Sequence, residues 1–263
     1  MTARIWAIML NTFREAIRNK VLYGALFVVV AANFMAVVLG EMLLAEEARV
    51  ARDVGLAGVS LFGAMTAIFL GVTLLYGEIQ KKTIHVILAK PIRRWEFVIG
   101  KYAGMGLTLT LLVVAFAGAL AAMLWFEGLP FDAATAKAVV LGWCEVLTVA
   151  AIAIFFSSFS TPFLSGIFTF GLFFIGRSYA DLSYAASKAK EPVLQTIAEI
   201  ALWLVPDLHT FAISGGEVAG KHVTVHGDFV GWGYVAAAAG YGAAVIAVLL
   251  LLAVLIFQRR DFL

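Results

Sequence analysis

The sequence has little charge and a single cysteine. Charged residues make up 14% of its 263 residues, against about a quarter in an average soluble domain, while hydrophobic residues make up 63%. One cysteine, Cys144, excludes an intramolecular disulfide and a cysteine metal cluster. The net charge of +2 is too small to indicate nucleic-acid binding. Such an apolar excess indicates that lipid solvates much of the chain.

Six apolar segments are long enough, or nearly so, to cross the roughly 30 Å of membrane hydrocarbon. They are residues 21–44, 54–77, 101–126, 136–157, 162–179 and 230–257. Each segment is apolar on nearly all faces, which favours burial in lipid over packing in a soluble bundle. No internal repeat or linker divides the chain. The sequence therefore predicts an all-α integral membrane protein with six transmembrane helices in a single domain, residues 1–263.

Cationic residues near the ends of these segments predict the orientation in the membrane. Twelve of the nineteen Lys and Arg residues fall on the side that holds both termini and residues 78–101, and seven fall on the other side. Acidic residues show the reverse asymmetry, four against twelve. We therefore expect a cytoplasmic-membrane protein with both termini in the cytoplasm.

Residues 1–20 alternate apolar and cationic faces with helical period. The apolar face holds Ile5, Trp6, Met9, Leu10, Phe13 and Ile17, and the polar face holds Arg4, Asn11, Arg14 and Arg18. The pattern predicts an interfacial helix whose cations contact anionic lipid headgroups. Its role is either a topological anchor or a part in gating.

The stretch "EIQKKTIHVILAKPIRRWEFVIGK", Glu78–Lys101, is longer than a plain connection between two antiparallel helices requires. Its centre places Ile84, Ile87 and Leu88 on one helical stripe, and Pro91 ends that helix. Lys81, Lys82 and Lys90 flank the stripe. A short amphipathic helix of this kind lies on lipid headgroups or docks into a groove on a soluble partner.

The pattern E-x-x-x-K-T-I-x-x-x-L-x-x-P-I-x-R-W-E-F-x-x-G-K in this stretch resembles the loop between the second and third spans of ABC-2-type ABC transporter permeases. Six spans, the interfacial helix, "LVPDLHTF" (Leu204–Phe211) and "FQRRDFL" (Phe257–Leu263) agree with that family, so the resemblance covers nearly the whole chain. Within the family, the chain is similar to the permeases grouped with the copper-associated NosY protein, a broad group that does not define a substrate.

The resemblance implies the ABC-2 (type V) permease architecture and a coupling helix that binds a separate ABC ATPase subunit. Carried onto this chain, residues 82–90 form that helix, and Arg93, Arg94 and Lys101 hold the loop at headgroup level. The implied coupling residues are Glu78, Lys81, Lys82, Thr83, Ile84, Ile87, Leu88, Lys90, Pro91 and Arg94. Other implied partners are a second permease copy or paralogue, membrane lipids and accessory extracytoplasmic subunits.

The chain has no phosphate-binding P-loop of its own. The nearest match to G-x-x-x-x-G-K-[ST] has Gly100 as its second glycine, but Trp95 replaces the first glycine and Tyr102 replaces the hydroxyl residue. "ISGGE", Ile213–Glu217, resembles an ABC ATPase signature but falls on the extracytoplasmic side, where we interpret it as a glycine turn. We therefore expect no catalytic residue and no cofactor in this chain, with ATP and Mg on the partner ATPase.

Residues 181–229 form the longest stretch that does not span the membrane. Residues 193–205 within it are about 20 Å long as a helix, too short to span, which predicts a re-entrant or interfacial helix. That helix either caps the exit of a pathway or packs on the bundle. His222 and His226 in "HVTVH" would chelate a metal on a helix, but the β-branched residues between them favour a strand in a surface hairpin, so we expect no metal site.

Glu145 lies within the fourth apolar segment, where an acid usually faces a partner or a wet cavity. Arg177 reaches a similar depth from the fifth segment, so we predict a Glu145–Arg177 ion pair that acts as a structural latch or as part of a pathway. Small and hydroxyl residues either allow close helix packing or line a pathway. They are Ser60, Gly63, Thr66, Ser165 and Thr169.

Together with the family resemblance, these patterns favour the membrane subunit of an ABC-2 transporter, and the resemblance implies export. An integral membrane enzyme acting on lipids is the first alternative, but it requires a cluster of Asp or His residues at one membrane face, which the sequence does not contain. A membrane scaffold without transport is the second alternative. An ATPase that co-purifies with the chain distinguishes the transporter from both.

Overall fold

The structure is a computed structural model of the chain. It describes residues 2–20, 22–28, 30–31, 47–80, 93–188, 192–212, 216–218, 221–223 and 230–259. The helices are α1 (Thr2–Ile17), α3 (Glu47–Gln80), α5 (Arg94–Phe126), α6 (Ala133–Ser157), α7 (Pro162–Arg177), α8 (Tyr179–Lys188), α9 (Pro192–Leu204), the short 3₁₀ helix η1 (His209–Phe211) and α10 (Trp232–Arg259). The predicted all-α fold is confirmed for the bundle.

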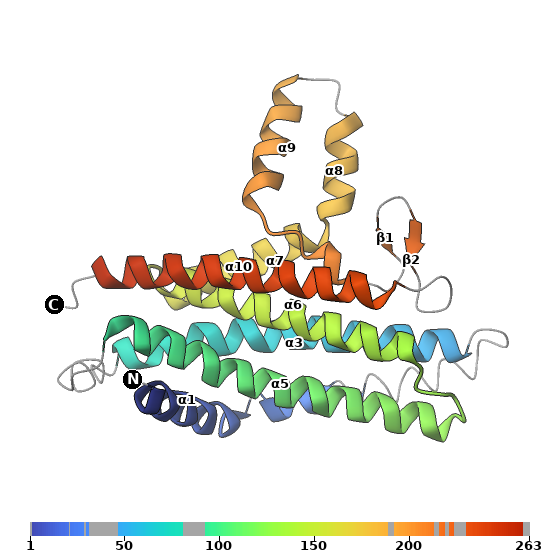
Figure 1. Ribbon diagram of the computed structural model, residues 1–263, viewed down its shortest axis with the longest axis horizontal. Coiled ribbons are helices and arrows are strands. Elements are labelled where there is room, and N and C mark those ends of the chain that lie inside the picture. The colour runs from blue at the N-terminus through green and yellow to red at the C-terminus, as the bar shows by residue number, and fades with distance from the viewer. Residues whose placement is uncertain are drawn as a thin grey trace.

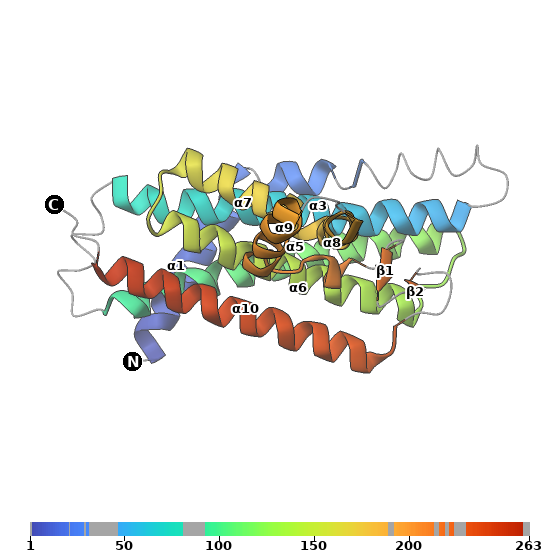
Figure 2. The same ribbon diagram turned by 90° about the horizontal axis from the view of Figure 1, so that it is seen from above.

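Helices α3, α5, α6 and α10 run side by side along the longest axis of the molecule (Figures 1 and 2). Helix α6 lies at the centre and packs against α3, α5, α7 and α10. Its residues Ala150, Ala151 and Ala153 have no exposed surface, because small side chains let neighbouring helices approach closely.

Four described helices, α3, α5, α6 and α10, are long and apolar enough to cross a membrane. A fifth is obtained if α7 and α8, bent by 66° where they meet, count as one span. The predicted first span, residues 21–44, lies largely outside the described residues, of which 22–28, 30 and 31 are helical. The described part of the chain therefore supports a multi-pass membrane protein with four or five of the six predicted spans.

Several element ends differ from the predicted ones. Helix α5 begins at Arg94, seven residues before the predicted Lys101, because Glu96 accepts a hydrogen bond of 2.9 Å from the backbone N–H of Arg93 and caps the helix. Helix α3 continues to Gln80, so the predicted loop 78–100 is shorter at both ends. Helix α6 begins at Ala133 rather than at residue 136 because Asp132 caps it.

The fifth apolar segment does not continue straight to residue 179 as predicted. Helix α7 ends at Arg177, and the chain turns into α8. Helices α8 and α9 pack together and stand off the bundle as a hairpin (Figure 1). The range of helix α9, Pro192–Leu204, matches the short helix predicted for residues 193–205. Trp203 on this helix is 87% exposed.

Two short strands, β1 (Gly216–Val218) and β2 (Lys221–Val223), form an antiparallel hairpin in which Glu217 lies opposite His222. The hairpin includes the start of "HVTVH", where the sequence favoured a strand, and the end of "ISGGE". His226 lies outside the described residues.

Candidate functional site: the α1 end of the bundle and the buried charge cluster

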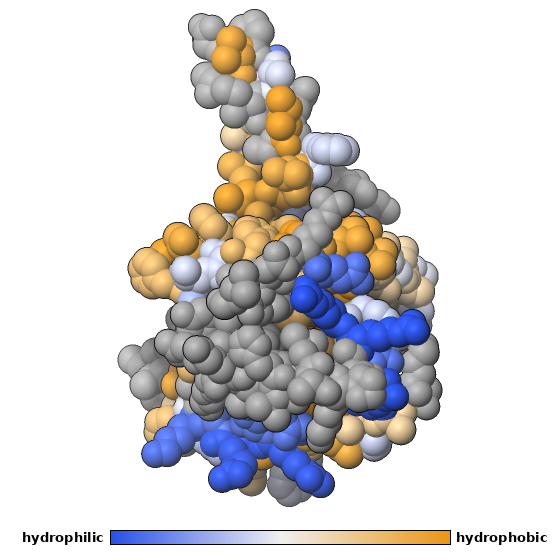
Figure 3. All heavy atoms as spheres, turned by 90° about the vertical axis from the view of Figure 1, so that its left-hand side faces the viewer, coloured by the Kyte–Doolittle hydropathy of each residue, from blue (hydrophilic) through white to orange (hydrophobic). Residues whose placement is uncertain are grey.

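We call the end of the bundle formed by α1, the first turns of α5 and the last turn of α10 the α1 end. Figure 3 looks onto this end and shows hydrophilic side chains gathered along the edge formed by α1. Arg4 and Arg14 of α1, and Arg18 directly after it, are exposed there, as the predicted polar face requires. The face of α1 that packs on α5 includes Ile8, Met9 and Thr12, so it is not the predicted apolar stripe alone, and Trp6 of that stripe is 59% exposed.

The predicted coupling helix, residues 82–90, falls within residues 81–92, which lie outside the described residues. Lys81, Lys82, Thr83, Ile84, Ile87, Leu88, Lys90 and Pro91 are therefore not placed by the structure. Glu78 belongs to the last turns of α3, and Arg94 is the first residue of α5. Residues 81–92, which we call the coupling segment, are thus flanked on both sides by helices that continue through the bundle.

Arg94 connects α5 to the end of α10. Its Nη1 donates hydrogen bonds to the backbone carbonyls of Phe257, at 3.0 Å, and Gln258, at 2.9 Å. These carbonyls belong to the last turn of α10, where they have no partner within the helix. The ring of Phe97 also stacks on that of Phe257, with centroids 5.8 Å apart. Arg94 thus caps a neighbouring helix, and its contact with the ATPase or headgroups stays a prediction.

We expect Arg94→Ala to loosen the last turn of α10. Hydrogen bonds from a charged donor contribute about 1.5–3 kcal/mol each, so amide hydrogen exchange at residues 255–259 should accelerate about tenfold or more. Arg93→Ala is the matched control, because Arg93 is exposed and precedes the helix. Equal exchange rates in the two variants would contradict this role of Arg94.

Lys101, predicted to hold the loop at headgroup level, lies buried beneath α1. Its side chain is 3% exposed, and its Nζ lies 3.5 Å from Oε2 of Glu15 in α1 and 5.9 Å from the ring centre of Phe97. The burial of Lys101 follows from the close approach of α1 to α5. A buried lysine needs a counter-charge, which Glu15 supplies.

Two glycines of α5 allow that close approach. A Cβ atom on Gly100 would lie 2.8 Å from Cβ of Ile8, and one on Gly104 would lie 2.5 Å from the carbonyl oxygen of Met9 and 2.6 Å from Cβ of Thr12. These distances leave no room for a side chain. The start of α5, directly after the coupling segment, is therefore in tight contact with both α1 and α10.

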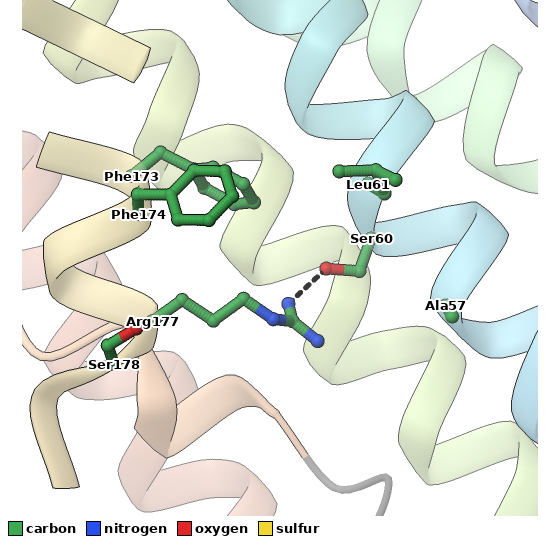
Figure 4. A pocket seen from close by; sticks show the side chains of 7 residues that line it. All are labelled: Ala57, Ser60, Leu61, Phe173, Phe174, Arg177 and Ser178. Atoms are coloured by element: carbon green, nitrogen blue, oxygen red, sulfur yellow. Dashed lines mark hydrogen bonds between the residues drawn. The ribbon is translucent and has the colours of Figure 1, made fainter. Parts of the chain in front are cut away.

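Glu145, Arg177 and Ser60 form a buried polar cluster that joins α6, α7 and α3. Nη1 of Arg177 lies 2.7 Å from Oε1 of Glu145, and the hydroxyl of Ser60 donates to Oε2 of Glu145 at 2.5 Å. Nη1 of Arg177 also donates to Ser60 Oγ (Figure 4). The structure thus brings together the predicted pair and adds Ser60, which the sequence did not assign to it.

The two charges of this pair are buried to different extents. The side chain of Glu145 is 1% exposed and that of Arg177 is 31% exposed. A carboxylate buried this deeply requires a charged partner, because an isolated charge in a low-dielectric interior is very costly. The cluster therefore holds three helices in a defined relation at one depth of the bundle.

A cavity of about 300 Å³ opens beside Arg177, between α3 and α7. Figure 4 shows the guanidinium reaching across it towards Ser60, with Phe173 and Phe174 on the α7 side and Leu61 on α3. Ala57 and Ser178 complete the lining. Of the five predicted pathway residues, only Ser60 lines this cavity.

The other predicted pathway residues occupy packing positions or a second cavity. A Cβ atom on Gly63 would lie 2.6 Å from Cγ2 of Val146, so Gly63 allows α3 to meet α6. Ser165 and Thr169 are fully buried, and Thr169 donates to the carbonyl of Ser165 at 2.6 Å. Thr66 lines an apolar cavity of about 390 Å³ together with Phe62, and its hydroxyl donates to the carbonyl of Phe62.

An ion pair that the sequence analysis did not identify joins α3 to α6 at the opposite end of the bundle. Nη1 of Arg52 lies 3.2 Å from Oδ2 of Asp132, and Nη2 donates to the carbonyl of Pro130 at 3.1 Å. Oδ1 of Asp132 accepts from the backbone N–H of Thr135 at 2.8 Å and from its hydroxyl at 2.7 Å. The spacing Asp-x-x-Thr before an apolar run was the available signal, since Asp is a favoured helix N-cap.

Partial burial opposes the ionisation of Asp132, but the hydrogen bonds from Thr135 and the charge of Arg52 outweigh it and lower the pKa of this carboxyl. A lowered pKa means that Asp132 stabilises the fold above its unfolded pKa of about 4 and that this contribution is lost as the pH falls through the folded pKa. We expect the Tm of the wild type to fall more steeply below pH 4 than that of Asp132→Asn, which keeps a capping side chain. Parallel pH profiles would contradict this.

The "LVPDLHTF" segment ties the hairpin of α8 and α9 back to the bundle. Asp207 Oδ2 accepts from the hydroxyl of Thr210 at 2.9 Å, and the backbone N–H of Asp207 donates to the hydroxyl of Tyr241 in α10 at 2.8 Å. The backbone N–H of Leu208 donates to the carbonyl of Gly176 in α7 at 3.1 Å. The segment therefore joins α7 and α10 beneath the hairpin.

Comparison with known proteins agrees with this arrangement. Residues 6–262 match the family described as "ABC-2 family transporter protein". No match was found among curated proteins. The family match covers almost the whole chain but does not reach the level of the NosY-like group, which stays a prediction. The chain belongs to the ABC-2 transporter family and is a multi-pass permease subunit of an ABC transporter.

Proposed function

We propose that this chain is the membrane-spanning subunit of an ATP-driven exporter and that a separate ABC ATPase docks on the predicted coupling helix, residues 82–90 of the cytoplasmic loop 78–101. One observation carries the proposal. The segment is flanked by the ends of α3 and α5, and the start of α5 is fastened to two further helices, α1 and α10. A displacement of this segment would therefore act on four helices of the bundle at once.

The contacts at the start of α5 provide the route for that displacement. Arg94 holds the last carbonyls of α10, and the Gly100–Gly104 face holds α1. A closely packed interface between helices has few intermediate arrangements. A shift at one end of a rigid helix is therefore transmitted to the helices packed against it. ATP-driven movement of the ATPase would in this way change the relation of α1, α5 and α10 within the membrane.

The proposed complex contains two ATPases and two permeases, as a second copy or a paralogue, with the pathway between the permeases. The termini lie in the cytoplasm, as the cation distribution indicates, and the membrane is the cytoplasmic one. ATP and Mg bind to the ATPase and not to this chain. The two conformations must bind substrate with different affinity, since otherwise ATP hydrolysis would not drive transport.

Co-purification with the ATPase tests the proposal. We expect Ile84→Asp or Leu88→Asp to reduce the recovered ATPase at least tenfold, because each places a charge on the predicted contact stripe. Ala89→Asp is the matched control, since helical spacing puts residue 89 on the opposite side of the same segment. Full recovery with the stripe variants, or equal loss with the control, would contradict docking through this face.

A further inference from the structure

We propose that the cavity between α3 and α7 is a binding site for an anionic phospholipid of the surrounding bilayer, with the phosphate held by Arg177. The inference goes beyond the coupling of this chain to an ATPase. It concerns a property of the permease chain alone and is tested without the ATPase.

The guanidinium of Arg177 is only partly used within the protein. Among the described residues, it donates hydrogen bonds through Nη1 only, to Glu145 and Ser60. A guanidinium carries further N–H donors on Nε and Nη2. Because the side chain is 31% exposed and lines the cavity, these donors are open to whatever fills it. Figure 4 shows the second terminal nitrogen directed away from Ser60.

The depth of the cavity determines what can satisfy these donors. Ser60 lies five residues inside the apolar window Gly55–Thr73 of α3, which is about 7.5 Å along the helix. Water is scarce at this depth, and an unsatisfied charged donor in hydrocarbon is costly. A phosphate oxygen is the acceptor that the bilayer itself supplies to a guanidinium, and the two match in geometry.

The remaining walls suit an acyl chain. Phe174 is 55% exposed and Leu61 is 42% exposed, so the cavity opens sideways towards lipid, while Phe173 forms a buried wall. Its volume of about 300 Å³ is at the lower limit for small-molecule sites and fits a headgroup with the first part of a chain. Glu145 holds Arg177 in place from behind, so little side-chain freedom is lost on binding.

Ala57 offers a way to close the cavity without touching the charge cluster. It is exposed, lines the cavity and is small, so Ala57→Trp should fill the space that the ligand needs. Ala122→Trp is the matched control, because Ala122 is exposed near the C-terminus of α5 and does not line this cavity. A second variant, Glu145→Gln with Arg177→Gln, removes the guanidinium without leaving the buried carboxylate unpaired.

The experiment is native mass spectrometry of the full-length protein in detergent, titrated with dioleoyl phosphatidylglycerol. A second titration uses dioleoylglycerol, an uncharged lipid with the same acyl chains, and a third uses oleic acid. We expect one phosphatidylglycerol to bind at least tenfold more tightly than dioleoylglycerol. Ala57→Trp should weaken that binding at least tenfold, and Ala122→Trp should leave it unchanged. The double Gln variant should lose the preference for the anionic lipid.

Three results would overturn the assignment. Equal binding of the charged and uncharged lipids would remove the role of Arg177. Unchanged phosphatidylglycerol binding in Ala57→Trp, with an unchanged Tm, would place the lipid elsewhere. Binding of oleic acid without phosphatidylglycerol would show that the site takes a free carboxylate and not a bilayer phospholipid. None of these results bears on ATPase docking, so failure here is separable from failure of the proposed function.

Discussion

Arg177→Gln should destabilise the folded chain by about 3–5 kcal/mol, the usual cost of removing one partner of a buried ion pair. The variant leaves the carboxylate of Glu145 1% exposed with Ser60 as its one described partner. Because Glu145, Ser60 and Arg177 join α6, α3 and α7, the loss should loosen the contacts among these three helices. Unfolding of the purified chain in detergent, followed by temperature or denaturant, measures the effect.

The double variant Glu145→Gln with Arg177→Gln is the control for this prediction. It removes both charges and leaves polar side chains of similar length, so it should be clearly more stable than Arg177→Gln alone. The charge exchange Glu145→Arg with Arg177→Glu tests the same pair in another way, and should recover more folded protein than either single reversal. If a double variant is no more stable than the corresponding single variants, the two charges do not stabilise each other.

Gly104→Ala should destabilise the α1 end and reduce transport-coupled ATP hydrolysis. The new methyl group would lie 2.5 Å from the carbonyl oxygen of Met9, and a backbone atom cannot move aside as a side-chain tip can. Overpacking of this kind costs about 1–3 kcal/mol. Since α1 would be pushed away from α5, we expect the reconstituted complex to retain the ATPase but to lose most substrate-stimulated hydrolysis.

Gly118 provides a matched control on the same helix. A Cβ atom there meets nothing within 4 Å, so Gly118→Ala should stabilise α5 by up to about 1 kcal/mol through its better helix propensity. The two substitutions are chemically identical and are predicted to have opposite signs. If both variants have the same stability and the same hydrolysis rate, the close approach of α1 to α5 has no role in stability or coupling.

The sequence predicted the helical bundle well because the signal for a membrane helix is a long apolar run, which needs no knowledge of neighbours. Glu145 and Arg177 could be paired for a related reason. A charge inside such a run has few ways to be satisfied, and the order of the helices limited the choice to one arginine at a similar depth. Ser60 was not assigned to the pair, because a serine in a span is as often a packing residue.

The α1 end was predicted less well. Lys101 and Arg94 read as headgroup-binding cations, since nothing in the sequence shows that α1 folds over Lys101 or that the last turn of α10 ends beside Arg94. Gly100 and Gly104 allow this arrangement, but glycines four residues apart are common in membrane helices of many kinds. The bend after Arg177 was missed because Gly176, the glycine beside it, lies in an apolar run, and glycine is common in membrane helices. The cavity beside Arg177 exists only once α3 and α7 are packed.

If the coupling helix, residues 82–90, receives movement from an ATPase on another chain, a cysteine at residue 84 should report that contact. Cys144, the one native cysteine, is buried, so Ile84→Cys supplies the accessible thiol of the chain. We predict that this thiol reacts with a membrane-impermeant maleimide from the cytoplasmic side alone, and that it forms a cross-link to the ATPase whose yield changes when ATP is added. Labelling from the outside, or no cross-link in a complex that still contains the ATPase, would contradict the account.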